Sequence, residues 1–215
     1  MSGRVVLHGY FRSSAAFRVR IALNLKGLAY ESRTCHLRKS EQRAPSYLAM
    51  NPQGLVPTLE IDGKVLVQSV SIIEYLDETR PRPALQPAGA AERARCRALA
   101  QLVACDIHPL NNLRVLQYLR TSLGVPETGE RAWYSHWLTA GFDAFEALLQ
   151  ASPGPFCCGE LASLADACLI PQVFNALYRS FDMSPYPRIR SIFDHAMRLP
   201  EFAEAAPNRQ PDAEA

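Results

Sequence analysis

The stretch TLEIDGKVLV, residues 58–67, decides the fold class. Two short apolar runs of strand type flank the pair Asp62-Gly63. Both positions of a two-residue hairpin turn need positive φ, and Asp-Gly is one of the pairs that adopt it readily. The pair therefore favours a β-hairpin. The stretch therefore predicts two adjacent antiparallel strands. Pro57 directly precedes the first strand, and its bond to Val56 can be cis or trans.

The residues before and after the hairpin alternate between strand and helix patterns. Residues 5–10 form an apolar run typical of a buried strand, and residues 13–26 predict a helix. Residues 30–36 predict a second strand, and residues 37–50 are polar and irregular, with room for one short helix. Another helix begins at Ser69, directly after the hairpin. Because a strand–helix–strand unit implies a parallel pair, this order predicts a mixed, thioredoxin-like sheet with the hairpin at its edge.

The rest of the chain predicts only helices. A linker over residues 81–90, which contains three prolines, leads into a helix over residues 91–108. Pro109 should kink this helix, because proline removes one backbone hydrogen bond. Further helices are expected over residues 111–123, over residues 133–149 and behind a capping box formed by Ser163 and Asp166.

The two kinds of pattern imply two domains. Residues 1–84 predict an α/β thioredoxin-like domain, and residues 90–210 predict an all-α domain. Residues 210–215 are polar, and we expect them to fray.

Composition and charge limit the partners of the chain. The net charge of 215 residues is only +2, and the basic residues form no block, so nothing indicates nucleic-acid binding. A mild excess of basic residues in the first domain suits a small anionic ligand. No apolar run approaches the roughly 18 residues of a membrane helix, and the N-terminal residues lack the features of a secretory signal. We therefore expect no membrane partner and a cytoplasmic location. The six cysteines show no metal-site or C-x-x-C spacing, which favours buried, reduced cysteines and no bound metal.

Several motifs together resemble the zeta class of the glutathione transferases. The matching segments are YFRSSAAFRVRIAL (10–23), NPQGLVPTL (51–59), QSVSIIEYL (68–76), IHPLNNL (107–113), LIPQV (169–173) and APNRQPD (206–212). The resemblance covers essentially the whole chain. It implies the glutathione transferase fold, an α/β thioredoxin-like N-terminal domain followed by an all-α C-terminal domain. It also implies a homodimer that uses glutathione to isomerise maleylacetoacetate or maleylpyruvate, in tyrosine degradation or other aromatic catabolism.

The helix that begins near residue 13 is the expected site of the glutathione sulfur. The N-terminus of a helix offers free N–H groups and a partial positive charge, and a serine hydroxyl there can donate a hydrogen bond to a thiolate. Ser13 and Ser14 both qualify by position, and the resemblance favours Ser13 as the catalytic hydroxyl. The alternative is that both serines only cap the helix. Ala15, also in the glutathione site, stands where the family usually has cysteine, so the nucleophile has to be the glutathione sulfur.

Other residues are expected to bind the rest of glutathione. Gln68 and Ser69 lie where a strand meets a helix N-terminus, a geometry that binds carboxylates, and the resemblance assigns them to the γ-glutamyl end. Val56 would offer backbone groups to the cysteinyl part, as an added strand does. Gln42 aligns with a family contact. The alternatives are an ordinary N-cap, an edge-strand valine and a solvated loop glutamine.

The second domain supplies three further candidates. His108 and Asn112 are four residues apart and would share one helix face, and Arg114 follows them. Their motif resembles that of bacterial isomerases and implies contact with glutathione, whereas a lone helical histidine is often structural.

The implied substrate is a small dianion with a cis double bond next to a carbonyl. Its carboxylates call for arginine, which binds them in a bidentate manner. Arg12, next to the sulfur site, is the first candidate for this catalytic and substrate-binding role, and Arg114 and Arg179 are the others. The family often has arginine at the position of Tyr178, one residue before Arg179. Each arginine could instead be a surface or ion-pair residue.

Two competing functions remain open at this point. One is the conjugation or dehalogenation of small electrophiles by glutathione, and the other is a non-catalytic binding module of transferase type. The sequence also does not decide between maleylacetoacetate and maleylpyruvate.

Overall fold

The computed structural model describes residues 4–149 and 154–214. The chain divides into two compact units, one formed by Met1–Gln86 with Ala196–Ala215 and the other by Pro87–His195. Within the described residues, no helix is long and apolar enough to cross a membrane.

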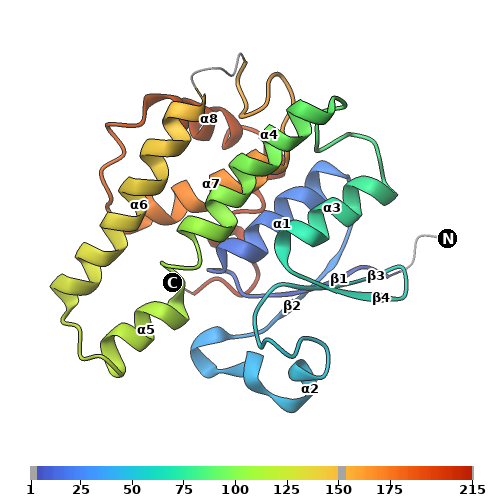
Figure 1. The fold of residues 1–215 in the computed structure, drawn as a ribbon. Helices are drawn as coiled ribbons and strands as arrows, with labels where there is room; N and C mark the ends of the chain where they lie inside the picture. Colours follow the sequence, from blue (N-terminus) through green and yellow to red (C-terminus); the bar gives the residue numbers. More distant parts are fainter. Residues whose placement is uncertain (1–3, 150–153, 215) are drawn as a thin grey trace. The chain divides into compact units, whose positions relative to one another are not determined.

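The first unit contains a four-stranded mixed sheet (Figure 1). Its strands are β1 (Val6–Gly9), β2 (Glu31–Thr34), β3 (Thr58–Ile61) and β4 (Lys64–Val67), in the spatial order β2-β1-β3-β4. β1 pairs with β2 in parallel and with β3 in antiparallel orientation. β3 and β4 form the predicted hairpin, in which Asp62 and Gly63 have φ of 52° and 70°. The thioredoxin-like sheet is thus confirmed.

Two helices cover one face of this sheet. α1 (Ser14–Leu25) and α3 (Ser69–Thr79) lie side by side in Figure 1. Strand alternation places Leu59 and Ile61 of β3 on one face of the sheet, and both are buried in the core. Each such buried side chain stabilises the fold by about 1.5–3 kcal/mol. The irregular segment after β2 holds two 3₁₀ turns, Leu37–Lys39 and Glu41–Arg43, and the short helix α2 (Pro45–Leu48).

The second unit is helical, as expected. Its helices are α4 (Ala90–Gln101), α5 (Leu113–Thr121), α6 (Glu127–Leu149), α7 (Leu164–Tyr178) and α8 (Pro187–Ala196). α7 packs against α4 and is buried over most of its length. The capping box at its start is present, because Ser163 N donates to Asp166 Oδ2 over 2.9 Å and the Ser163 side chain receives the N3 backbone N–H.

The predicted kink before Pro109 takes a different form. The α-helical pattern ends at Gln101, and Leu102–Ile107 forms a π-helix in which His108 N donates to Val103 O over 2.9 Å. The backbone therefore widens well before the proline. α6 approaches closely at this point, because a Cβ atom added at Gly141 would lie 2.2 Å from Ile107 Cγ1. Tertiary packing as well as the proline accompanies the change in helix type.

The segment 196–215 belongs to the first unit, which differs from the domain boundary expected at residue 210. It carries α9 (Pro200–Ala203) and a 3₁₀ turn, Pro207–Arg209. Side chains of α1 hold its backbone: Arg20 Nε donates to Ala205 O over 2.8 Å, and Asn24 Nδ2 donates to Glu201 O over 3.0 Å. The expectation that residues 210–215 fray is wrong for residues 210–214, since several of them bond to the unit.

Candidate active site

Ser13 is the N-cap of α1. β1 ends at Gly9, and a turn follows in which Ser13 N donates to Tyr10 O over 2.9 Å. The Ser13 backbone is extended, with φ −71° and ψ 112°, and its Oγ accepts a hydrogen bond from Ala16 N at 3.1 Å. The capping alternative is therefore correct for Ser13. It is compatible with the catalytic hypothesis, because a hydroxyl that accepts from the backbone still has its proton to donate.

The first turn of α1 adds backbone donors beside this hydroxyl. The N–H groups of Ser14 and Ala15 have no acceptor within the helix, because the first N–H groups of any α-helix point out of its end. Ser14 is buried, with 8% of the residue exposed, whereas Ser13 and Ala15 are half-buried. Exposure thus favours Ser13 over Ser14 as the hydroxyl that meets a ligand. Small residues are needed here, since a Cβ atom on Gly9 would lie 3.1 Å from Ala16 Cβ.

The N-terminus of α3 is built differently. Gln68 precedes it with φ 68° and ψ 115°, a positive φ that costs a non-glycine residue about 1–3 kcal/mol. Its side chain donates to Gln53 Oε1 over 2.7 Å. Ser69, the first residue of the helix, is buried, and its Oγ accepts from Arg18 Nη1 at 3.2 Å. The sequence indicated this pair but neither the strain at Gln68 nor the link to Arg18.

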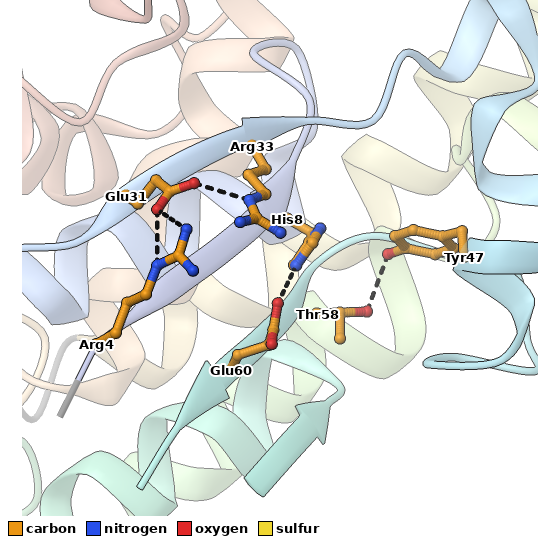
Figure 2. A network of polar contacts seen from close by, with 7 residues as sticks. All are labelled: Arg4, His8, Glu31, Arg33, Tyr47, Thr58 and Glu60. Carbon is orange, nitrogen blue, oxygen red and sulfur yellow. Dashed lines mark hydrogen bonds and ion pairs between the residues drawn. The ribbon is translucent and has the colours of Figure 1, made fainter. Parts of the chain in front are cut away.

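The loop before β3 is fixed by buried polar groups. Leu55 O accepts from Tyr47 OH and from Asn51 Nδ2, both over 2.7 Å. Figure 2 shows Tyr47 also meeting Thr58, with 2.9 Å between the two hydroxyl oxygens. Burial raises the pKa of Tyr47 to about 12, so it stays a neutral hydrogen-bonding group. Val56, half-buried at the end of this loop, precedes a cis bond to Pro57.

Gln42 lies beside the same loop. It belongs to the 3₁₀ turn Glu41–Arg43, and a Cβ atom added at Gly54 would lie 3.0 Å from Gln42 O. Among residues 4–149 and 154–214, no group bonds to its buried Oε1 atom. A buried amide oxygen of this kind is costly unless a donor satisfies it, so Gln42 fits a contact with a ligand N–H group.

The other polar cluster in Figure 2 lies on the sheet, and its His8 ring meets Tyr47 edge-on, with 6.3 Å between ring centres. Glu31 receives Arg4 Nε over 2.9 Å and Arg33 Nε over 2.8 Å, and His8 Nε2 lies 2.6 Å from Glu60 Oε1. The Glu31 pairs are exposed, and exposed pairs contribute little to stability. We assign these residues no chemical role.

The candidates of the second unit form their own cluster. Asn112 is the N-cap of α5, with its Oδ1 accepting from Arg114 N at 3.1 Å. Its Nδ2 lies 3.4 Å from His108 Nε2. The two side chains lie close together, but the shared helix face that was predicted is absent, because residues 108–112 form turns and a bend.

The arginine candidates differ in their surroundings. Arg179 ends α7, where its Nη1 lies 3.5 Å from Glu130 Oε1 and its guanidinium lies 4.6 Å from the centre of the Tyr134 ring. The ion-pair alternative therefore describes Arg179 well. Arg12 is half-buried and directly precedes Ser13. Tyr178, at the family's arginine position, is exposed.

The cysteines do not all follow the expectation. Four of them are buried, but Cys158 is half-buried and Cys105, on the π-helix, is exposed. Burial raises the pKa of Cys35 to about 11, which keeps that thiol protonated. In the part of the chain that the structure describes, no three metal-binding side chains come together.

Comparisons with known proteins agree on one family. Residues 7–84 match the model for the glutathione S-transferase N-terminal domain. A probable maleylacetoacetate isomerase of Vibrio cholerae is 51% identical over 97% of this chain and 98% of its own length. The holo structure of maleyl pyruvate isomerase, a bacterial zeta-class enzyme, has a TM-score of 0.95 and 47% identity, covering 97% of this chain and all of that one. A maleylacetoacetate isomerase of Methylobacterium extorquens, solved with malonate and GSH bound, has a TM-score of 0.94 and 42% identity, covering 98% of this chain and all of that one.

Proposed function

Because this chain belongs to the zeta-class glutathione transferase family of maleylacetoacetate and maleylpyruvate isomerases, we propose that it catalyses the glutathione-dependent cis–trans isomerisation of one of these two keto acids. The observation that carries the proposal is the Ser13 hydroxyl at the start of α1, beside the N–H groups of Ser14 and Ala15, which have no acceptor within the helix. The sequence resemblance and the position of Ser13 at the start of α1 both support this assignment.

Three features of the first unit fit glutathione. The start of α1 suits its sulfur, the start of α3 suits a carboxylate, and the buried Gln42 Oε1 atom suits a peptide N–H donor. When bound, glutathione supplies the nucleophilic sulfur that Ala15 cannot supply.

The role of Ser13 is to favour the charged form of that sulfur. Its hydroxyl proton remains available because only its oxygen is used in capping Ala16. A hydrogen bond to the thiolate and the positive end of the α1 dipole both lower the thiol pKa. Each unit of that pKa corresponds to about 1.4 kcal/mol. The N–H groups of Ser14 and Ala15 add to the positive electrostatic potential at the start of α1, which also stabilises the thiolate.

The remaining first-unit residues hold the tripeptide. Ser69 and the backbone N–H groups at the start of α3 receive the γ-glutamyl carboxylate, and the strained Gln68 sets the entry of the chain into that helix. Val56 offers backbone groups to the cysteinyl part. Gln42 accepts a hydrogen bond from the peptide.

Arginines bind the carboxylates of the substrate. Arg12 is the first candidate, because it directly precedes Ser13. Arg114 is the second, and with His108 and Asn112 it also contributes to glutathione binding in this proposal. Arg179 is the weakest, since its guanidinium already meets Glu130 and Tyr134. The malonate in the Methylobacterium extorquens relative, a dicarboxylate, is consistent with such a site.

To test the proposal, the purified chain is incubated with each keto acid, with and without glutathione, and the loss of the cis isomer is measured. We expect glutathione-dependent loss of at least one of them. If neither reacts while glutathione binds and a small halogenated electrophile is conjugated, the chain is a conjugating transferase instead. If glutathione does not bind, the chain is a non-catalytic module and the proposal fails.

We further propose a cytoplasmic homodimer that acts in aromatic catabolism, such as tyrosine degradation. The family resemblance supports the dimer and the pathway. Sedimentation equilibrium of the purified chain tests the dimer, and a mass of a single chain at micromolar concentration would contradict it.

A further inference from the structure

The backbone of Phe11, two residues before Ser13, is held from both sides. Its N–H donates to Asp212 Oδ2 over 3.1 Å, and its C=O accepts from Arg20 Nη2 at 3.2 Å. The first contact joins residues at opposite ends of the sequence. Since Phe11 precedes Arg12 directly, these two bonds fix the peptide from which the candidate site begins.

Arg20 extends the connection to the C-terminal segment. Its Nε donates to Ala205 O over 2.8 Å while Nη2 binds Phe11, so one buried guanidinium spans both segments. Burial lowers the pKa of Arg20 to about 10, which leaves it charged at neutral pH.

The course of the segment up to Asp212 is also fixed. Gln210 is buried, and its Nε2 donates to Glu204 O over 2.9 Å and to Ala206 O over 3.0 Å. Ala213 N donates back to Gln210 O over 3.0 Å, which closes a turn around Asp212. Asp212 therefore reaches Phe11 from a backbone that is itself anchored.

The end of the segment makes a second attachment near the same turn. Glu214 Oε1 lies 2.6 Å from His36 Nε2, and its other oxygen lies 3.2 Å from Arg38 Nη1. Lys39 N donates to His36 Nδ1 over 3.3 Å, so Nε2 carries the proton that meets Glu214. The His36 ring packs against Tyr10, with 4.9 Å between ring centres.

We propose that residues 205–214, here called the C-terminal brace, set the position of the Arg12-Ser13 turn, and that Asp212 is a positioning residue for the thiol site. The inference rests on the proposed function. Asp212 acts through the Phe11 peptide: loss of its bond lets the turn of Arg12 and Ser13 move away from its present position at the end of β1. A displacement of about 1 Å at a reacting group can lower the reaction rate while the fold stays intact.

Two substitutions at Asp212 separate geometry from charge. Asp212→Asn keeps an oxygen that can accept from Phe11 N–H, whereas Asp212→Ala does not. Asp194→Ala, at an exposed residue of α8 in the other unit, is the matched control. Each variant is assayed for kcat and KM of isomerisation, for glutathione affinity by calorimetry and for the thiol pKa of bound glutathione.

We expect Asp212→Ala to lower kcat about tenfold and to raise the thiol pKa, as the loss of one charge-assisted hydrogen bond would. Asp212→Asn and the control should stay within about threefold of the unchanged chain. Equal activity of Asp212→Ala and the unchanged chain would overturn the proposal, and so would an Asn variant as impaired as the Ala variant. If the unchanged chain neither binds glutathione nor isomerises, the proposed function has failed instead.

A truncation keeps the test open if Asp212→Ala does not fold. Removal of residues 214–215 takes away the Glu214 contacts with His36 and Arg38 but leaves Asp212. We expect about a threefold loss of kcat in a folded chain. Unchanged kcat would show that the distal attachment does not position the turn and would overturn that part of the brace.

Discussion

The N-termini of α1 and α3, two helices of the first unit, are built in opposite ways. α1 begins with a relaxed N-cap, Ser13, whose oxygen satisfies Ala16 N. α3 begins after a strained residue, Gln68, and its serine oxygen is satisfied by the buried Arg18. Both arrangements leave a serine proton free to donate. The start of α1 suits a thiol, which has to lose its proton before it becomes an anion. The start of α3 suits a carboxylate, which is already an anion at neutral pH.

We expect the largest effect from a substitution at Ser13. Ser13→Ala removes the proposed sulfur donor, so we expect kcat/KM to fall about 10²–10³-fold, as when one donor to a developing anion is lost. The ascending limb of the pH–rate profile should move to higher pH, because the thiol pKa rises. Loss of the cap should cost about 1 kcal/mol of unfolding free energy.

Ser163→Ala is the control for this variant, because it removes the N-cap of α7 in the other unit. It should lose stability by about 1–2 kcal/mol and keep its activity while folded. If Ser13→Ala is no less active than this control, Ser13 is a cap and nothing more.

Ser69→Ala should affect binding rather than turnover. Arg18 would lose its hydrogen bond to Ser69 Oγ, and the loss of such a bond at a buried site costs about 1–3 kcal/mol of stability. Glutathione affinity should weaken about tenfold, while kcat at saturating glutathione stays nearly constant. Calorimetry and saturation kinetics measure the two quantities. A large fall in kcat with unchanged affinity would contradict the division of roles between the two helices.

The strain at Gln68 can be measured with a matched pair of variants. Gln68→Gly and Gln68→Ala both remove the contact with Gln53, but only glycine adopts φ 68° without strain. In urea denaturation we expect the free energy of unfolding of the glycine variant to exceed that of the alanine variant by about 1 kcal/mol. An alanine variant that is equally stable would mean that the backbone at residue 68 relaxes.

The smallest effect is expected at Ala15. Ala15→Cys restores the residue that the family usually has, but in the proposed site only the backbone N–H of this residue acts. Isomerase kcat/KM should therefore change by no more than about twofold. A rise well above that in steady-state assays would assign the protein thiol a part in the isomerisation.

Local sequence signals predicted much of this fold. Asp62 and Gly63 define their turn by their own φ preferences, and the residues at the start of α1 define their cap. What the sequence did not reveal depends on distant partners. The π-helix accompanies the close approach of Gly141, and the ordered C-terminal segment depends on contacts such as Phe11 with Asp212. The positive φ of Gln68 runs against the preference of the residue itself, so no local pattern indicates it.

The bond between Phe11 and Asp212 also bears on synthesis. The two residues are 201 positions apart, so this contact forms only after residue 212 has been synthesised and has left the ribosome. At about 5–20 residues per second, the first strand and helix wait at least ten seconds for it, a time set by translation rather than by folding. A chain that stops short of residue 212 lacks the contact, whatever the rest of it has folded into. The hydrogen bond of the Phe11 N–H to Asp212 is therefore among the later contacts that the growing chain can form.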